Sequence, residues 1–140
     1  MGEKKFMKRI VHFSLGVAAL MHSLGSIAAE SGDFSKSQIC RATIGAIMGR
    51  DPKIIKMDKA EADVIHVSYI RANDGTAWNQ RCRIQGMKVI WATETGRWRD
   101  DPLDEVISYT VTPTTLTIRQ KFSDGSSSAQ SYTRAQLGRN

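Results

Sequence analysis

One polar stretch of the sequence, ETGRWRDDPL, gathers the side chains that are best suited to recognition. It places Trp98 between Arg97 and Arg99, and an aromatic face beside guanidinium groups can stack on a sugar ring or hold an anionic partner. Side chains two apart project to the same side of an extended backbone, so both arginines would face away from Trp98. We predict that the loop from Thr93 to Asp104 forms part of a partner-binding surface. The alternative is that Trp98 plugs the core while the arginines pair with aspartates of the loop.

Two more basic residues, Arg81 and Arg83, alternate with less polar positions in a segment that has the pattern of a strand. They should therefore point away from the core and join the loop residues as candidates for partner binding. The same reasoning gives outward positions to Lys88, Arg119 and Lys121. The alternative is an ordinary solvated sheet face, whose charges guard against pairing with other sheets.

Acidic residues of the same region offer a second kind of chemistry. Asp100, Asp101, Asp104 and Glu105 lie close together in sequence. A pair of carboxylates can supply the general acid and base of glycoside hydrolysis. Nothing around these residues matches a catalytic motif, and clustered loop acids are usually surface charge. A small hydrolase acting on an envelope polymer is therefore the alternative function, and we assign no catalytic residue.

No other pattern indicates catalysis, a metal or a cofactor. Beyond the first 29 residues His66 is the one histidine, and neither a GxSxG elbow nor a phosphate-binding loop occurs. The cysteines and histidine do not have the spacing of a zinc site. We expect no metal site and no cofactor.

The two cysteines predict a disulfide between Cys40 and Cys82. Cys40 lies on the apolar face of a predicted helix, and Cys82 lies in the apolar row of a predicted strand. Two independent periodicities thus bring both sulfur atoms to one interface. In an oxidising compartment a single pair of cysteines forms one bridge, and closing a loop of about 43 residues would stabilise the fold by about 4 kcal/mol. The alternative is two free buried thiols.

A helix is well signalled between Lys36 and Met48. Ser35 or Ser37 can cap its first turn, because a hydroxyl accepts a hydrogen bond from a free backbone N–H. Gly49 can adopt the left-handed conformation that ends a helix, and Pro52 follows. The residues that share its apolar face are Ile39, Cys40, Thr43, Ile44, Ile47 and Met48.

The rest of the chain alternates between apolar and polar residues and is punctuated by turn residues, which indicates sequential strands. The predicted strands cover residues 65–69, 78–85, 89–93, 106–111, 116–122 and 129–134. We therefore predict an α+β fold with one N-terminal helix packed on an antiparallel meander sheet of five to six strands. A strongly coiled sheet of this kind could also close toward a small barrel.

The first 29 residues have the three parts of a cleaved secretory signal. Four basic residues precede an uncharged run, Ile10–Ala29, which ends in small residues. We predict a signal peptide over residues 1–29, a single exported domain over residues 30–140, and a periplasmic or secreted location. The alternative is a retained anchor, since about 20 uncharged residues can just span a bilayer, and only such an uncleaved segment would meet a membrane.

The net charge of the predicted exported domain indicates which kind of partner it favours. Four of the 20 basic residues and one of the 14 acidic residues lie in the predicted signal, so the net charge falls from +6 to +3 on its removal. A mildly basic exported domain favours anionic partners, whereas nucleic acid would need a denser basic patch. The predicted build, with its one disulfide between Cys40 and Cys82, resembles that of bacterial lysozyme inhibitors and exported immunity proteins, in architecture alone. We predict a small non-enzymatic binding module that recognises or inhibits a protein or an anionic envelope component.

Overall fold

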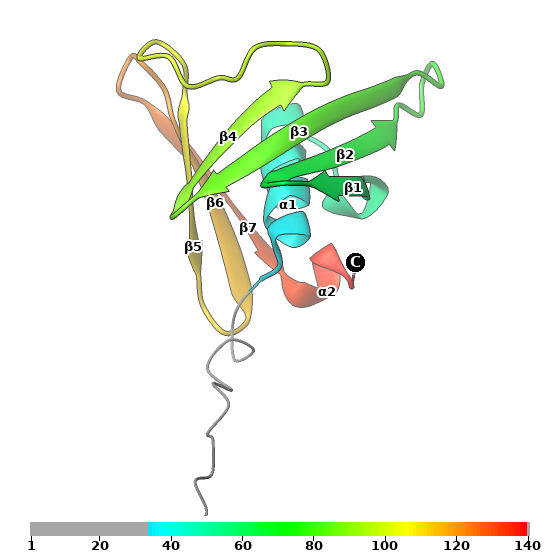
Figure 1. Cartoon of the computed structure of the whole chain (residues 1–140). Helices are drawn as coiled ribbons and strands as arrows, with labels where there is room; N and C mark the ends of the chain where they lie inside the picture. Colours follow the sequence, from blue (N-terminus) through cyan, green and yellow to red (C-terminus); the bar gives the residue numbers. More distant parts are fainter. Residues whose placement is uncertain (1–33, 140) are drawn as a thin grey trace, which may run out of the picture.

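A computed structural model describes residues 34–139 of the chain. The predicted signal peptide lies outside the described residues. One helix stands behind a long, curved antiparallel sheet, and a short second helix follows the last strand (Figure 1). The elements in chain order are α1 (Lys36–Met48), the 3-10 turn η2 (Pro52–Ile54), β1 (Lys56–Glu61), β2 (Val64–Ile70), β3 (Ala77–Gln85), β4 (Lys88–Thr93), β5 (Val106–Val111), β6 (Thr115–Lys121), β7 (Ser127–Thr133) and α2 (Arg134–Leu137).

Helix α1 has the predicted bounds and the predicted caps. The Ser35 side chain accepts a hydrogen bond from the Gln38 backbone, and the Gln38 side chain accepts one from the Ser35 backbone. This reciprocal capping box satisfies two donors at the start of the helix. At the other end Gly49 has φ 62°, a left-handed conformation that glycine adopts without steric cost.

The sheet is a meander of seven strands in the order β1-β2-β3-β4-β5-β6-β7, and every neighbouring pair is antiparallel. The predicted fold class is confirmed, but the predicted count of five to six strands is wrong. The possible barrel is not formed either, because β1 and β7 remain the two edges of the sheet. The sheet instead curves around α1, so that one face covers the helix and the other faces outward.

The strand missing from the prediction is β1. Its sequence, KMDKAE, has no alternation of apolar residues, and all six positions are exposed. An edge strand that covers no core needs no apolar face, so its sequence carries no period-2 signal. The four-residue helix α2 was likewise not predicted. It is held by a capping box between Thr133 and Gln136 and buries Leu137.

The core lies between α1 and the inner face of the sheet. Cys40 and Cys82 are fully buried there and form the predicted disulfide, with their Cα atoms 5.8 Å apart. The inner row of β3 also contains Gln80, which is 1% exposed and whose amide atoms have no hydrogen-bond partner within the described residues. Gln80 interrupts the apolar row from Trp78 to Cys82, which is why its burial was not foreseen.

No helix within residues 34–139 is long and apolar enough to cross a membrane.

Candidate functional site

Strands β4 and β5 are paired over only two residues each and then separate. The loop that connects them lies in the opening between them. The two strands share only the pairs Lys88–Ser108 and Val89–Ile107. Beyond these, the backbone N–H of Arg99 donates to the carbonyl of Trp91 on β4 at 3.0 Å. The loop thus lies against the strand before it, along the upper edge of the molecule in Figure 1.

An ion pair closes this loop on itself. Arg97 donates two hydrogen bonds to the carboxylate of Asp104, at 2.7 and 2.8 Å. Its Nη1 atom also lies 3.3 Å from Oδ2 of Asp101. Asp104 also accepts a hydrogen bond from the Asp101 backbone. The bidentate contact with Arg97 lowers the pKa of Asp104 to about 2 and raises the pKa of Arg97. Arg97 therefore holds the loop together rather than projecting freely from it.

Trp98 lies on the outer face of the sheet, where it contacts two arginines of β3. The guanidinium carbon of Arg83 is 3.8 Å from the centre of the indole ring, and that of Arg81 is 4.4 Å away. Trp98 is half-buried, so the structure contains neither the predicted core plug nor a fully exposed aromatic. We call these three residues the arginine–tryptophan surface. The sequence suggested Trp98 flanked by Arg97 and Arg99, whereas its stacking partners come from β3.

The two arginines of this surface differ in what else they bind. Arg81 donates to the carbonyl of Thr93 at 3.2 Å and to that of Gly96 at 2.7 Å, so it ties the loop to β3. Within the described chain, Arg83 makes no hydrogen bond or ion pair. Its guanidinium packs on the Trp98 ring, and its side chain is half-exposed. A guanidinium in this state can accept a carboxylate or phosphate in a bidentate contact.

Arg99 occupies the opposite face of the loop. Its guanidinium carbon lies 4.8 Å from the ring centre of Trp91, whose indole N–H donates to Glu105 at 3.0 Å. Arg97 and Arg99 therefore do not join the arginine–tryptophan surface, although both were predicted as candidates. Alternation along the loop sends Trp98 to one side and Arg99 to the other.

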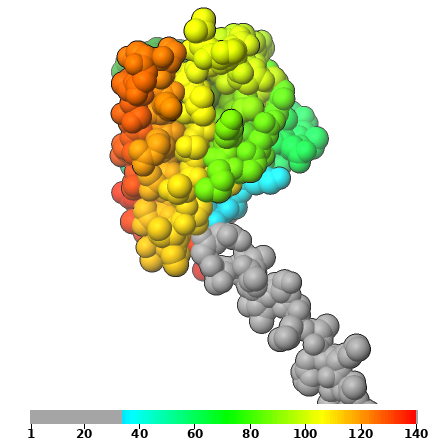
Figure 2. Space-filling model, turned by 90° about the vertical axis from the view of Figure 1, so that its left-hand side faces the viewer, coloured from blue at the N-terminus to red at the C-terminus, as the bar shows by residue number. Residues whose placement is uncertain are grey.

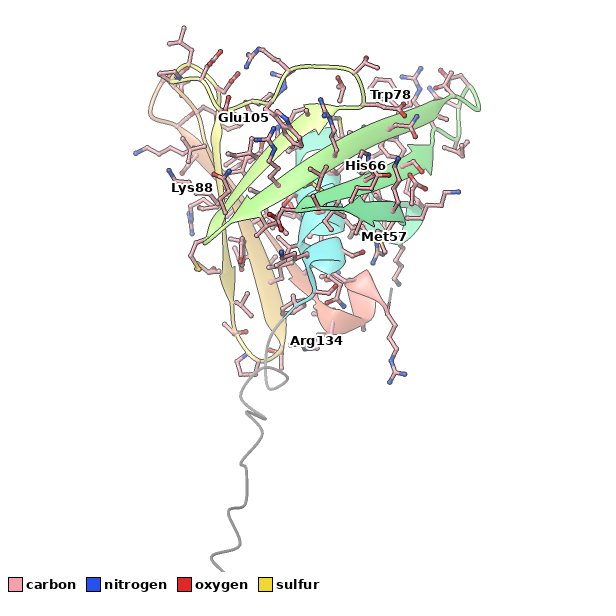
Figure 3. The ribbon with its side chains drawn as sticks, in the orientation of Figure 1. Met57, His66, Trp78, Lys88, Glu105 and Arg134 are labelled. Carbon is pink, nitrogen blue, oxygen red and sulfur yellow. A yellow bond between two sulfur atoms is a disulfide. The ribbon has the colours of Figure 1, made fainter. Side chains whose placement is uncertain are left out.

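Further basic side chains share the outer face with this surface. The register aligns Lys88 with Ser108 and Ser108 with Arg119 across three neighbouring strands. Lys121 follows on β6, and all three basic residues are exposed. Figure 3 shows Lys88 on the side of the sheet that is turned away from α1. The predicted outward basic face is thus assembled from β3, β4 and β6.

Three of the four loop acids are engaged in structural contacts. Asp104 and Asp101 pair with Arg97, and Glu105 accepts the Trp91 indole N–H. A small cavity of about 150 Å³ lies where β4 and β5 separate, lined by Asp100, Asp101 and Glu105 together with Lys88 and Arg99. With a pKa of about 2, Asp104 is ionised near neutral pH and holds no proton to donate. Asp104 is therefore not available as the general acid of the hydrolase alternative near neutral pH.

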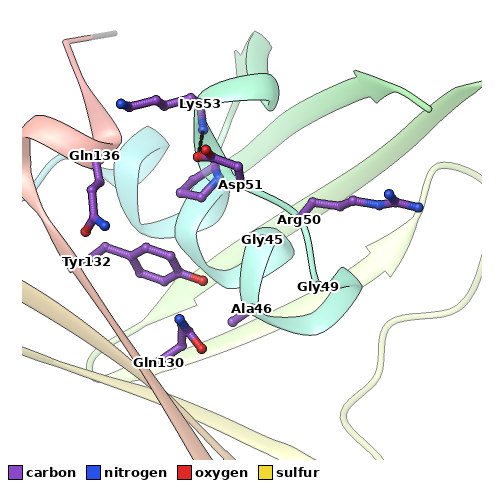
Figure 4. A pocket seen from close by; sticks show the side chains of 10 residues that line it. Gly45, Ala46, Gly49, Arg50, Asp51, Lys53, Gln130, Tyr132 and Gln136 are labelled. Atoms are coloured by element: carbon purple, nitrogen blue, oxygen red, sulfur yellow. Dashed lines mark hydrogen bonds between the residues drawn. The ribbon is translucent and has the colours of Figure 1, made fainter. Parts of the chain in front are cut away.

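A larger cleft of about 390 Å³ lies between α1, η2, β7 and α2 (Figure 4). The Tyr132 hydroxyl and the Gln130 side chain point into it from β7, facing Ala46 of the helix. Burial raises the pKa of Tyr132, and the charge of Asp51 adds to this. None of these residues was predicted as a site, because they come from four elements and share no sequence motif.

A second arginine–aromatic stack was also not foreseen. Tyr69 and Trp78 stack with their ring centres 6.3 Å apart, and the guanidinium carbon of Arg71 lies 5.0 Å from the Trp78 ring. Arg71 is held by an ion pair with Asp74 in the β2–β3 turn. That contact lowers the pKa of Asp74 and raises that of Arg71, so this cluster stabilises a hairpin.

Among residues 34–139, no group of three or more histidine, cysteine, aspartate and glutamate side chains could hold a metal ion. Comparisons with protein-family models, curated proteins and solved structures found no match to this chain.

Proposed function

We propose that this protein is a small exported binding module, periplasmic or secreted, which recognises or inhibits a protein or an anionic component of the envelope. One observation carries this proposal: on the outer face the guanidinium of Arg83 packs on the Trp98 ring and makes no hydrogen bond or ion pair within the described chain, while Arg81 ties the loop that carries Trp98 to β3. A pre-positioned guanidinium loses little conformational freedom when it binds an anion.

Two further features support the proposal. The basic side chains of Lys88, Arg119 and Lys121 extend the positive charge of the outer face, which would steer an anionic partner toward Arg83. The buried disulfide between Cys40 and Cys82 suits an oxidising compartment.

The proposal is tested by capturing partners from envelope extract with the purified protein as bait. Wild type and the variant Lys53→Ala should capture the same component, because Lys53 is an exposed cation next to the cleft and away from the outer face. Capture by Arg83→Ala should fall several-fold, while its melting temperature falls by only a few degrees because one arginine–aromatic contact is lost. Higher salt should weaken capture by wild type. Equal capture by Arg83→Ala and wild type would place the site elsewhere.

A further inference from the structure

The two edges of the sheet are protected very differently from unwanted pairing. Edge strand β1 carries four charged residues among its six, and a β-bulge interrupts its register between Met57 and Lys59. Charged side chains and bulges are the usual devices that keep an edge from pairing with another sheet. Edge strand β7 has neither: its sequence, SSAQSYT, contains no charge and no proline, and seven consecutive pairs join it to β6 in regular register.

The open part of β7 runs from Ser127 to Ser131. These five residues are all exposed, whereas Tyr132 is buried where α2 packs against the end of the strand. Figure 2 shows this orange segment along one margin of the molecule, with no other element over it in that view. A neighbouring strand therefore has access to β7 along most of its length.

The hydrogen-bond alternation determines which backbone groups are available at this edge. The Phe122 N–H donates to the Ser126 carbonyl at 2.8 Å, so the even-numbered residues of β7 direct their backbone groups toward β6. The backbone groups of Ser127, Ala129 and Ser131 consequently point away from the sheet. Thr133 is excluded, because its N–H already donates to the Gln136 side chain.

From these observations we infer that β7 is the interface of a homodimer, in which β7 of a second copy pairs with it antiparallel about a two-fold axis at Ala129. In this register Ala129 faces Ala129 of the second copy, and Ser127 faces Ser131. All three residues with free backbone groups then pair in both copies, which no other two-fold register achieves. The outward side chains at the junction are small, so the strands can approach without steric hindrance.

The charge distribution fits a second copy of this basic chain. β7 contributes no charged side chain, so no like charges meet directly across the axis. The outward cation nearest to the axis is Arg119 of the neighbouring strand β6, which is paired with Ala129 of β7. Arg119 of the two copies would be three strand spacings apart, about 14 Å, which exceeds the screening length of roughly 8 Å at physiological salt. Dimer formation would therefore continue the outer face, with its basic residues, across both copies.

Sedimentation of the purified protein over a concentration series up to about 1 mM tests the dimer. Wild type should shift from monomer to dimer, and Ala129→Lys should weaken the association at least tenfold by placing two lysines at the axis. Thr110→Lys adds the same charge to the outward side of the internal strand β5 and should dimerise like wild type. Ala129→Pro is a second variant, since its missing N–H is not used within the monomer, and it should also abolish dimerisation. A wild type that stays monomeric throughout, or an Ala129→Pro variant that dimerises normally, would overturn the inference.

The register has its own test by oxidative cross-linking. Ala129→Cys should form a covalent dimer, because facing Cα atoms in a hydrogen-bonded pair are about 5.5 Å apart, within the range that a disulfide spans. Ala60→Cys, at the charged edge β1, is the matched control and should remain monomeric. Equal cross-linking by the two variants would contradict the assignment of β7 as the interface. None of these results depends on the proposed function, because no anionic partner is present.

Discussion

At the scale of single residues, the outer face is organised by contacts between arginine and tryptophan. Trp98 touches both Arg81 and Arg83, and Arg81 in turn fastens the loop through two backbone carbonyls. The indole therefore has two effects: it holds the loop on the sheet, and it restrains Arg83. Because Trp98 is only half-buried, these effects should be separable from the stability of the core.

Replacing Trp98 by alanine should lower the free energy of unfolding by about 1–2 kcal/mol, the sum of two arginine–aromatic contacts at a partly exposed site. Replacing a fully buried tryptophan by alanine would lower the free energy of unfolding by about 3–5 kcal/mol. Trp91→Ala is the matched control, since Trp91 is 5% exposed, and its loss should fall in that higher range. Urea denaturation measures both values. A loss of more than about 3 kcal/mol for Trp98→Ala would mean that Trp98 acts as a core residue.

The Arg97–Asp104 pair gives a pH dependence of known sign. The pKa of Asp104 falls from its ordinary 3.8 to about 2 in the folded chain, so its contribution to stability is present above the ordinary value. It is lost as the pH falls from about 4 toward 2. The difference in melting temperature between wild type and Asp104→Asn should therefore be constant above about pH 5 and shrink below pH 4.

Asp100→Asn serves as the control for this titration, because Asp100 lies in the same loop and makes no ion pair among the described residues. The difference in melting temperature between wild type and Asp100→Asn should not shrink below about pH 4. A melting difference for Asp104→Asn that stays unchanged down to about pH 2 would show that Arg97 does not hold this carboxylate.

At the scale of elements, the disulfide joins the centre of β3 to the first half of α1. Both sulfur atoms are buried, so the bridge fixes the helix against the inner face of β3. The outward side chains of β3 project from the opposite face of the same strand. Loss of the bridge should therefore affect the stability of the whole fold rather than one loop.

The double variant Cys40→Ala/Cys82→Ala should lose about 2–5 kcal/mol of unfolding free energy relative to wild type. Wild type treated with reductant should lose a similar amount, which separates the bridge from any effect of the new side chains. An unfolding free energy within error of wild type in both cases would show that the bridge does not stabilise the fold.

The elements differ in how far the sequence predicts them. Helix α1 was predicted to the residue, because a cap, an apolar face and a terminal glycine all agree. Strand β1 was missed, because an exposed edge strand needs no apolar alternation. The loop between β4 and β5 was recognised as a loop, but its contacts were not. Stacking partners on another strand depend on register and strand separation, which local patterns do not encode.

At the scale of the whole molecule, the sheet separates two sides with different properties. Its inner face covers α1 and the disulfide, while its outer face presents the arginine–tryptophan surface and the exposed lysines and arginines. The outward direction of Arg81 and Arg83 was predictable from period-2 alternation. The cleft beside Tyr132 was not, because its walls meet only after the sheet has curved around the helix.

Hydrogen exchange of the protein with and without the captured component shows whether the outer face binds the partner. Binding at the outer face should slow exchange in residues 81–88 and 96–99, while exchange in residues 45–53 and 130–136 around the cleft stays unchanged. Slower exchange confined to the cleft segments, with residues 81–88 and 96–99 unaffected, would show that the partner binds at the cleft and not at the outer face.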